Sequence, residues 1–211
     1  LPFYQISTEQ KESLRDQFIK PDDYLALPES YRSMIDESVS LFNFLENKGS
    51  SFSPCFTPLL KSLDAASKSL VVSLLADSVP TKKAQQDAYF MPDYFFISDR
   101  DQSWLRKNAA GLKKALVYGS FIMPISMLSF CLEYAKMDPP FNVGEVSETT
   151  RKEFGKFNRS QLCDRVNHIR SFRNKYVAHQ TEDTERTDVE FARVELKNWI
   201  TGLREIHKAT I

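Results

Sequence analysis

The sequence predicts an all-α fold, a bundle of about six to eight helices. Apolar residues recur with the helical period along most of the 211 residues, residues typical of helix ends flank these segments, and convincing strand alternation is not found. Helices with one apolar stripe bury it by packing side by side, which gives a bundle. We expect residues 1–50 to form a separate hairpin or an added layer, and residues 51–211 to form the main bundle.

The N-terminal layer contains two predicted helices. The first is capped by Ser7 or Thr8, because a hydroxyl group at this position accepts a hydrogen bond from a free backbone N–H, and we expect it to run to about Lys20. The second begins near Pro28, since proline is favoured in a first helical turn, and it ends at Gly49.

A loop, a third helix and an aromatic stretch follow. Residues 50–58 hold two prolines and four serines or threonines, which favours a loop. The third helix starts at Leu59 on a leucine-rich stripe and is closed by Pro80. The aromatic stretch 89–97 fits an irregular connector or a short strand equally well.

The stretch 115–132 carries no charged side chain, and its 18 residues approach the minimum length of a membrane span. It also contains Gly119, Pro124 and three serines, so it would insert poorly into a bilayer. We interpret it as a buried helix that continues one opened by Asp99 or Asp101 and is kinked or broken at Pro124. The sequence therefore predicts a core helix and no association with a membrane.

The chain is electrically balanced, with 28 basic and 28 acidic residues, so net charge gives no argument for nucleic acid or membrane binding. Hydrophobic residues make up 42% of the chain, which is enough for a core. Three scattered cysteines are typical of a reducing, cytoplasmic setting rather than a disulfide framework. The chain begins at Leu1 without methionine, so we expect residues upstream, and no signal peptide is visible.

Two helices are predicted after a loop at about 138–147, and the first of them, residues 159–179, carries an arginine on its apolar stripe. That stripe steps by four, three, four and three residues, through Leu162, Val166, Ile169, Arg173 and Tyr176. A lone charge on such a stripe is costly unless it is paired. Arg173 therefore either pairs with a buried carboxylate or a carbonyl, or holds a phosphate, to which a planar guanidinium is suited. The last helix is expected over 188–209.

A histidine, His179, lies six residues after Arg173. On an ideal helix the two residues are about 120° apart and about 9 Å apart along the axis. The helix must therefore end or distort between them, or the two side chains must act together across a cleft, as a two-fold dimer would allow. Histidine moves protons near neutral pH, although a single histidine at a helix end often only complements the helix dipole.

Basic residues cluster between residues 151 and 175, a stretch that contains eight basic and only two acidic residues. Such a block is either a binding surface for phosphates or a solvated helix face that the acidic residues after 181 neutralise. The members we expect to contact nucleic acid are Arg159, Arg165, Arg170 and Lys175. Phe154, Phe157 and Phe172 lie among them and either stack on bases or, as we expect for most of them, pack in the core.

Together, Arg173, Asn174 and His179 resemble the signature of the HEPN superfamily (higher eukaryotes and prokaryotes nucleotide-binding domain). The family pattern is an arginine, commonly a polar residue directly after it, and a histidine that is separated from the arginine by four to six residues. Here Asn174 follows Arg173, and five residues intervene before His179. The residues of the motif, Phe172 to Lys175 with Ala178 and His179, resemble those of bacterial members linked to toxin–antitoxin and abortive-infection systems. The resemblance covers about residues 158–205.

The resemblance implies a helical bundle that forms a homodimer, with two motifs facing one cleft, and a metal-independent endoribonuclease activity without a cofactor. Arg173 would hold the scissile phosphate, His179 would transfer a proton, and Asn174 would orient one of them. The protein would be a toxin or phage-defence effector, with RNA as substrate and an antitoxin or regulatory protein as a possible partner. Members silenced by nucleotidylation carry a tyrosine two residues after the histidine, whereas this chain has Thr181.

Other chemistries find less support in the sequence. The chain has neither a glycine-rich phosphate loop nor a Gly-x-Ser-x-Gly motif, and Cys163 and His168 lack further ligands at zinc spacing. We therefore expect no metal site. Some HEPN members are inactive, so the alternative function is a non-catalytic helical module that binds a partner protein or a nucleotide.

Overall fold

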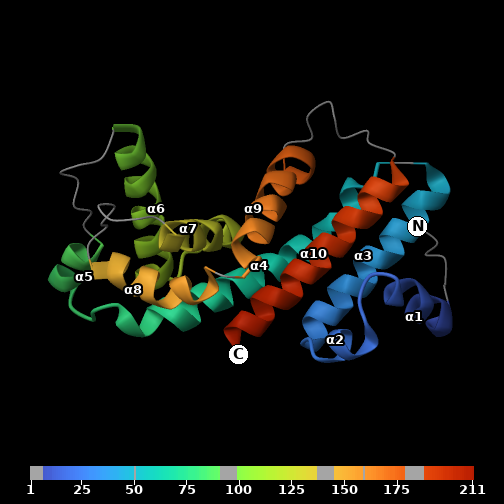
Figure 1. The fold of residues 1–211 in the computed structure, drawn as a ribbon, viewed down its shortest axis with the longest axis horizontal. Coiled ribbons are helices and arrows are strands. Elements are labelled where there is room, and N and C mark those ends of the chain that lie inside the picture. Colours follow the sequence, from blue (N-terminus) through green and yellow to red (C-terminus); the bar gives the residue numbers. More distant parts are fainter. Residues whose placement is uncertain (1–6, 50, 91–98, 137–144, 159, 179–187) are drawn as a thin grey trace. The chain divides into compact units, whose positions relative to one another are not determined.

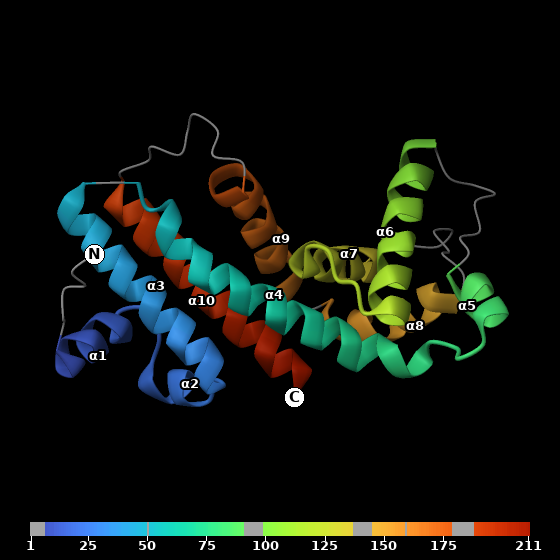
Figure 2. The ribbon, with the colours of Figure 1, turned by 180° about the vertical axis from the view of Figure 1, so that it is seen from behind.

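A computed structural model of the chain describes residues 7–49, 51–90, 99–136, 145–158, 160–178 and 188–211. In these ranges every regular element is a helix and no β-strand occurs (Figures 1 and 2). Ten of the elements are α-helices, eight of them long, so the predicted all-α class is confirmed. The predicted loop over 138–147 lies outside the described residues up to residue 144, and it is wrong for residues 145–147, where a helix begins at Glu145. Most of the aromatic stretch 89–97 also lies outside the described residues.

The chain forms two compact units, each built from segments that are far apart in the sequence. The first unit comprises residues 1–63 and 168–209, and the second comprises residues 64–167. The expected N-terminal layer, residues 1–50, belongs to the first unit, and its independence as a domain stays a prediction. Helices α4 and α9 each contribute residues to both units.

The first unit begins with three helices, α1 (Thr8–Asp16), α2 (Pro21–Leu25) and α3 (Glu29–Lys48). Ser7 caps α1, because its hydroxyl accepts a hydrogen bond from the N–H of Gln10 and the Gln10 side chain accepts one from the Ser7 N–H. Gly49 ends α3 with a left-handed φ of 63°, as predicted. The first helix stops earlier than predicted, because Pro21 starts a new helix and holds Lys20 in an extended conformation.

The predicted loop over residues 50–58 is wrong for most of its length, because α4 (Ser53–Leu75) already begins there. Pro54 lies in the first turn, where a missing N–H costs little. Pro58 lies inside the helix and cannot donate the usual hydrogen bond. The side chains of Cys55 and Phe56 are buried, so core packing stabilises this turn despite its prolines.

The core of the first unit is aromatic and centres on Trp199 of α10 (Val189–Thr210), whose first turn is capped by Asp188. Trp199 is fully buried, and its ring centroid lies 5.1 Å from that of Phe56 on α4 and 5.8 Å from that of Phe172 on α9 (Leu162–Phe172). Phe172 also packs on Phe191, which lies in the first turn of α10. These contacts hold the C-terminal part of α9 against α10 and α4.

The second unit contains the rest of α4, the helices α5 (Lys83–Tyr89), α6 (Asp99–Tyr118), α7 (Pro124–Lys136) and α8 (Glu145–Phe154), and the first residues of α9, with short 3-10 turns at Ala76–Ser78 and Gly155–Phe157. Helix α7 packs on both α6 and α8, and its described residues are mostly buried. The sequence analysis did not predict α5 and α8, because both are short and polar and follow segments rich in turn-forming residues.

The uncharged stretch 115–132 is broken before Pro124, as predicted, and its second part, in α7, is core, whereas the turn over 118–123 is largely exposed. Helix α6 ends at Tyr118, Gly119 takes a left-handed φ of 66°, and α7 begins at Pro124. The side chain of Asp64 accepts a hydrogen bond from the N–H of Ile125 at 3.2 Å, which satisfies a free donor in the first turn of α7. No helix within the described ranges is both long enough and apolar enough to cross a membrane.

Candidate functional site

The candidate site lies where α9 changes its helical geometry. Helix α9 is an α-helix up to Phe172, and residues Arg173–Ala178 continue it as a π-helix. The sequence analysis expected the helix to end or distort between Arg173 and His179, or the two side chains to act together across a cleft. The helix changes to π geometry at Arg173, whereas His179 lies outside the described residues. Such π-helical turns are rare and are found frequently at functional sites.

Arg173 is half-buried, and its Nη1 atom is buried without a hydrogen-bond partner. In the described part of the chain no ion pair involves Arg173, so the interpretation that it pairs with a buried carboxylate finds no support there. A buried, unpaired donor on a charged group costs free energy that an anionic ligand can recover. One N–H group of this guanidinium is therefore a buried donor with no acceptor in the structure.

Two neighbours of Arg173 lie in the same π-helical segment. Asn174 and Lys175 are exposed, and Arg170, one turn earlier on α9, is half-buried. Arg170 and Lys175 both make polar or ring contacts within the chain, so neither is a free cation. The structure thus brings Arg170, Arg173, Asn174 and Lys175 into one short helical segment of the first unit.

The remaining predicted site residues do not join this segment in the structure. His179 and Arg159 lie outside the described residues. Arg165 belongs to the part of α9 that lies in the second unit and makes a contact within the chain. Phe154 and Phe172 are buried, so these two aromatic side chains pack in the core, as expected, rather than face a ligand.

A histidine and a glutamate that the sequence analysis did not single out as site residues form a pair next to this segment. The Nε2 atom of His168 on α9 lies 2.8 Å from Oε2 of Glu195 on α10. The His168 side chain is 51% exposed, whereas that of Glu195 is only 6% exposed. The sequence held one signal for this pair, because Glu195 places a charge between Phe191 and Trp199 on the apolar stripe of α10.

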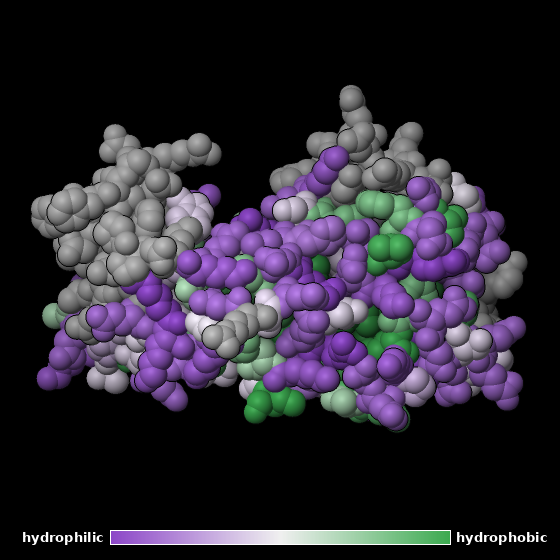
Figure 3. Space-filling view, viewed as in Figure 1, coloured by the Kyte–Doolittle hydropathy of each residue, from purple (hydrophilic) through white to green (hydrophobic). Residues whose placement is uncertain are grey.

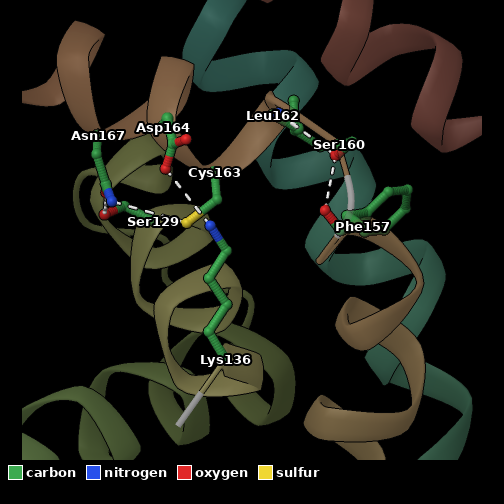
Figure 4. Close-up of polar contacts among 8 residues, drawn as sticks. All are labelled: Ser129, Lys136, Phe157, Ser160, Leu162, Cys163, Asp164 and Asn167. Atoms are coloured by element: carbon green, nitrogen blue, oxygen red, sulfur yellow. Dashed lines mark hydrogen bonds and ion pairs between the residues drawn. The ribbon is translucent and has the colours of Figure 1, made fainter.

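A polar cluster in the second unit surrounds the first turns of α9 (Figure 4). Ser129 donates a hydrogen bond to the Asn167 side chain at 2.5 Å, and Lys136 Nζ lies 3.4 Å from Asp164 Oδ1. Burial raises the pKa of the Cys163 thiol, although nearby Lys136 opposes this shift. Burial also raises the pKa of the Cys55 and Cys131 thiols, so the three free cysteines are poor nucleophiles.

Neither the hydropathy of the surface in Figure 3 nor the grouping of possible metal ligands indicates a second candidate site in the described ranges. Figure 3 shows mostly hydrophilic residues over α3 and α10, interrupted by small hydrophobic patches, and Phe44 and Val194 are among the exposed apolar residues of these helices. Among the described residues, no three histidine, cysteine or acidic side chains gather as metal ligands would.

Comparisons of this chain with protein-family models, with curated proteins and with solved structures gave no match.

Proposed function

We propose that the protein is a metal-independent endoribonuclease of the HEPN type that acts as a toxin or phage-defence effector. The observation that supports this most directly is the buried Nη1 atom of Arg173, which has no hydrogen-bond partner and lies at the first residue of a π-helical segment. A guanidinium with a free arm is suited to a non-bridging phosphate oxygen, whose negative charge would satisfy this donor.

In the proposed mechanism, Arg173 binds the scissile phosphate and stabilises the charge that develops on it. His179 transfers a proton as the 2′-hydroxyl attacks phosphorus, and Asn174 orients the phosphate or the imidazole. Lys175 and Arg170 contribute positive charge to the RNA backbone, as do Arg165 and Arg159 in other parts of the chain.

The end groups of the products test this mechanism. Because the neighbouring 2′-hydroxyl is the nucleophile, we expect cleaved RNA to end in a 2′,3′-cyclic phosphate and a 5′-hydroxyl, and we expect cleavage to persist in EDTA. End-group analysis of RNA incubated with the purified protein measures both. His179→Ala serves as the control for contaminating ribonucleases. The absence of cleavage, products with 3′-hydroxyl ends, or activity that EDTA abolishes would refute the proposal.

The oligomeric state is a second test. The offset of Arg173 and His179 on their helix favours a site that a two-fold dimer completes, so we expect a homodimer at micromolar concentration. Light scattering coupled to size-exclusion chromatography measures the mass directly. A mass of one chain, 24.4 kDa, over the concentration range of the activity assay would contradict a shared cleft.

One observation favours the second candidate, a non-catalytic module that binds a partner such as an antitoxin. Tyr118, Ile122 and Met123 are 66%, 66% and 48% exposed, and all three lie around the turn between α6 and α7. Exposed apolar residues that gather in one place are typical of interaction surfaces. A folded His179→Ala protein that cleaves RNA as fast as the parent would favour this candidate over the enzyme.

A further inference from the structure

The turn between α6 and α7, in the second unit, presents an aromatic ring to solvent on an ordered helix end (Figure 2). Tyr118 is the last residue of α6 and is 66% exposed. The N–H of Ser120 donates a hydrogen bond to the carbonyl oxygen of Lys114 at 3.1 Å, and Gly119 takes a left-handed φ of 66°. This hydrogen bond and this backbone conformation are those of a Schellman helix end, so the backbone that carries Tyr118 is held in place.

Helix α4 holds the other end of the turn. The side chain of Asp64 accepts the hydrogen bond from the N–H of Ile125 that begins α7. The Nζ atom of Lys68, also on α4, lies 5.2 Å from the centroid of the half-buried Phe121 ring. Because an ammonium group is attracted to the face of an aromatic ring, this contact keeps a positive charge beside the turn.

Positive charge dominates this part of the chain. Residues 102–132, which include the turn, hold four basic residues and no acidic residue. Lys107 and Lys114 are exposed and lie eleven and four residues before Tyr118, so the three side chains share one face of α6. Among the described residues, neither of these lysines nor Lys68 has an ion-pair partner. An anionic ligand at this surface therefore meets cations that no carboxylate of the described residues neutralises.

An exposed aromatic ring beside unpaired lysines is the combination of groups that binds single-stranded nucleic acid, because bases stack on the ring and the cations contact the backbone phosphates. Bases in a duplex already stack on one another, so they are not open to a tyrosine side chain. The exposed apolar residues of the turn also suit a partner protein, but the unpaired lysines favour an anionic partner. A second copy of this surface would bring lysines of like charge together, which disfavours self-association here.

We infer that the turn between α6 and α7 and its three unpaired lysines, Lys68, Lys107 and Lys114, bind single-stranded RNA; the choice of RNA rests on the proposed function. A base stacks on Tyr118, and the lysines contact phosphates of the same strand. None of these residues belongs to the proposed cleavage motif, so the surface contributes affinity for the substrate and takes no part in the chemical step.

An RNA that cannot be cleaved tests binding alone. A fluorescein-labelled 2′-O-methyl oligouridylate lacks the 2′-hydroxyl nucleophile, and its fluorescence anisotropy reports binding to the full chain. We expect Tyr118→Ala to weaken binding about tenfold, and Tyr118→Phe, which keeps the ring, to bind like the parent. Measuring both variants also in an Arg173→Ala background prevents binding at the cleavage motif from masking the effect.

Phe44→Ala is the matched control for the aromatic ring. Phe44 is 40% exposed, and the Nζ atom of Lys48 lies 5.9 Å from its ring centroid, so the two sites share a ring and a neighbouring ammonium group. Its helix, α3, however carries four acidic and two basic residues, which disfavours a polyanion. We expect this variant to bind the oligonucleotide like the parent.

The salt dependence of binding tests the lysines. Each phosphate that a cation neutralises on a single strand adds about 0.7 to the slope of log affinity against log salt concentration, so Lys114→Ala should lower this slope by about 0.7. Lys113→Ala is the control, because Lys113 already pairs with Asp87 and should change the slope less.

The possible outcomes separate this inference from the proposed function. Equal affinity of the parent and Tyr118→Ala proteins, at equal melting temperatures, would overturn the inference and leave the turn to the partner protein of the second candidate function. A blunt RNA duplex that binds as tightly as the single strand would also overturn it, because charge alone would then explain binding. If Tyr118→Ala weakens binding but the parent cleaves no RNA, the surface stands and the ribonuclease is refuted.

Discussion

Replacing Arg173 by alanine is expected to reduce RNA cleavage by about a hundredfold or more, which is the usual effect of removing one donor that stabilises developing negative charge. The physical reason is the buried Nη1 atom, because it has no hydrogen-bond partner that a phosphate oxygen would have to replace. Single-turnover cleavage rates of the parent and variant proteins measure the effect on the chemical step.

The conservative variant separates charge from shape. Arg173→Lys keeps the positive charge but loses the planar fork, so it should recover only a part of the activity that Arg173→Ala loses. Lys197→Ala is the matched control, because it removes an exposed cation from α10 in the same unit. Parent-like rates for Arg173→Ala, in a protein that melts at the parent temperature, would exclude Arg173 from the site.

The same variant should have little effect on stability. The sequence analysis offered a buried carboxylate as one partner for Arg173, but the structure describes no such carboxylate. Removing a half-buried arginine with an unpaired donor strands no other group, so we expect a change of less than about 1 kcal/mol in the free energy of unfolding.

Replacing Trp199 by alanine is expected to destabilise the protein by about 3–5 kcal/mol, the largest effect on stability that we predict. The side chain is fully buried and lies against Phe56 and Phe172, so its removal leaves a cavity lined by rigid rings. Urea unfolding followed by circular dichroism at 222 nm, a wavelength that reports helix, measures the loss.

Two further variants test the reason for this effect. The indole Nε1 of Trp199 is buried without a hydrogen-bond partner, so Trp199→Phe removes an unsatisfied donor along with some volume. It should therefore cost clearly less than Trp199→Ala. Val194→Ala, at a 49% exposed position of the same helix, should change stability by less than about 0.5 kcal/mol. Equal losses for the alanine and phenylalanine variants would show that packing volume does not dominate.

Much of the fold could be predicted because local interactions decide helix ends. Ser7, Gly49 and Asp188 act at short range on backbone groups within four residues, so their effects can be recognised in the sequence. The start of α4 could not be predicted in this way. Its prolines indicate a loop locally, whereas burial of Phe56 against α10, more than 140 residues away, stabilises the helix.

The candidate site shows the same division. The position of Arg173 on an apolar stripe and its angular offset from His179 on an ideal helix followed from helical spacing alone. The pairing of His168 with Glu195 joins residues that are 27 positions apart on two helices, and no spacing rule connects them. The sequence marked Glu195 only as a charge on an apolar stripe.

By itself, the sequence determined the all-α class, the helix ends at Ser7, Gly49 and Asp188, the start of a helix at Pro124 and the unusual place of Arg173, because each depends on periodicity and on contacts within one or two turns. Only the tertiary structure decided that residues 1–63 join residues 168–209 in one unit, that Arg173 has an unpaired donor, and that Glu195 holds His168. These features depend on which helices meet, and that choice minimises the free energy of the whole core rather than of any one segment.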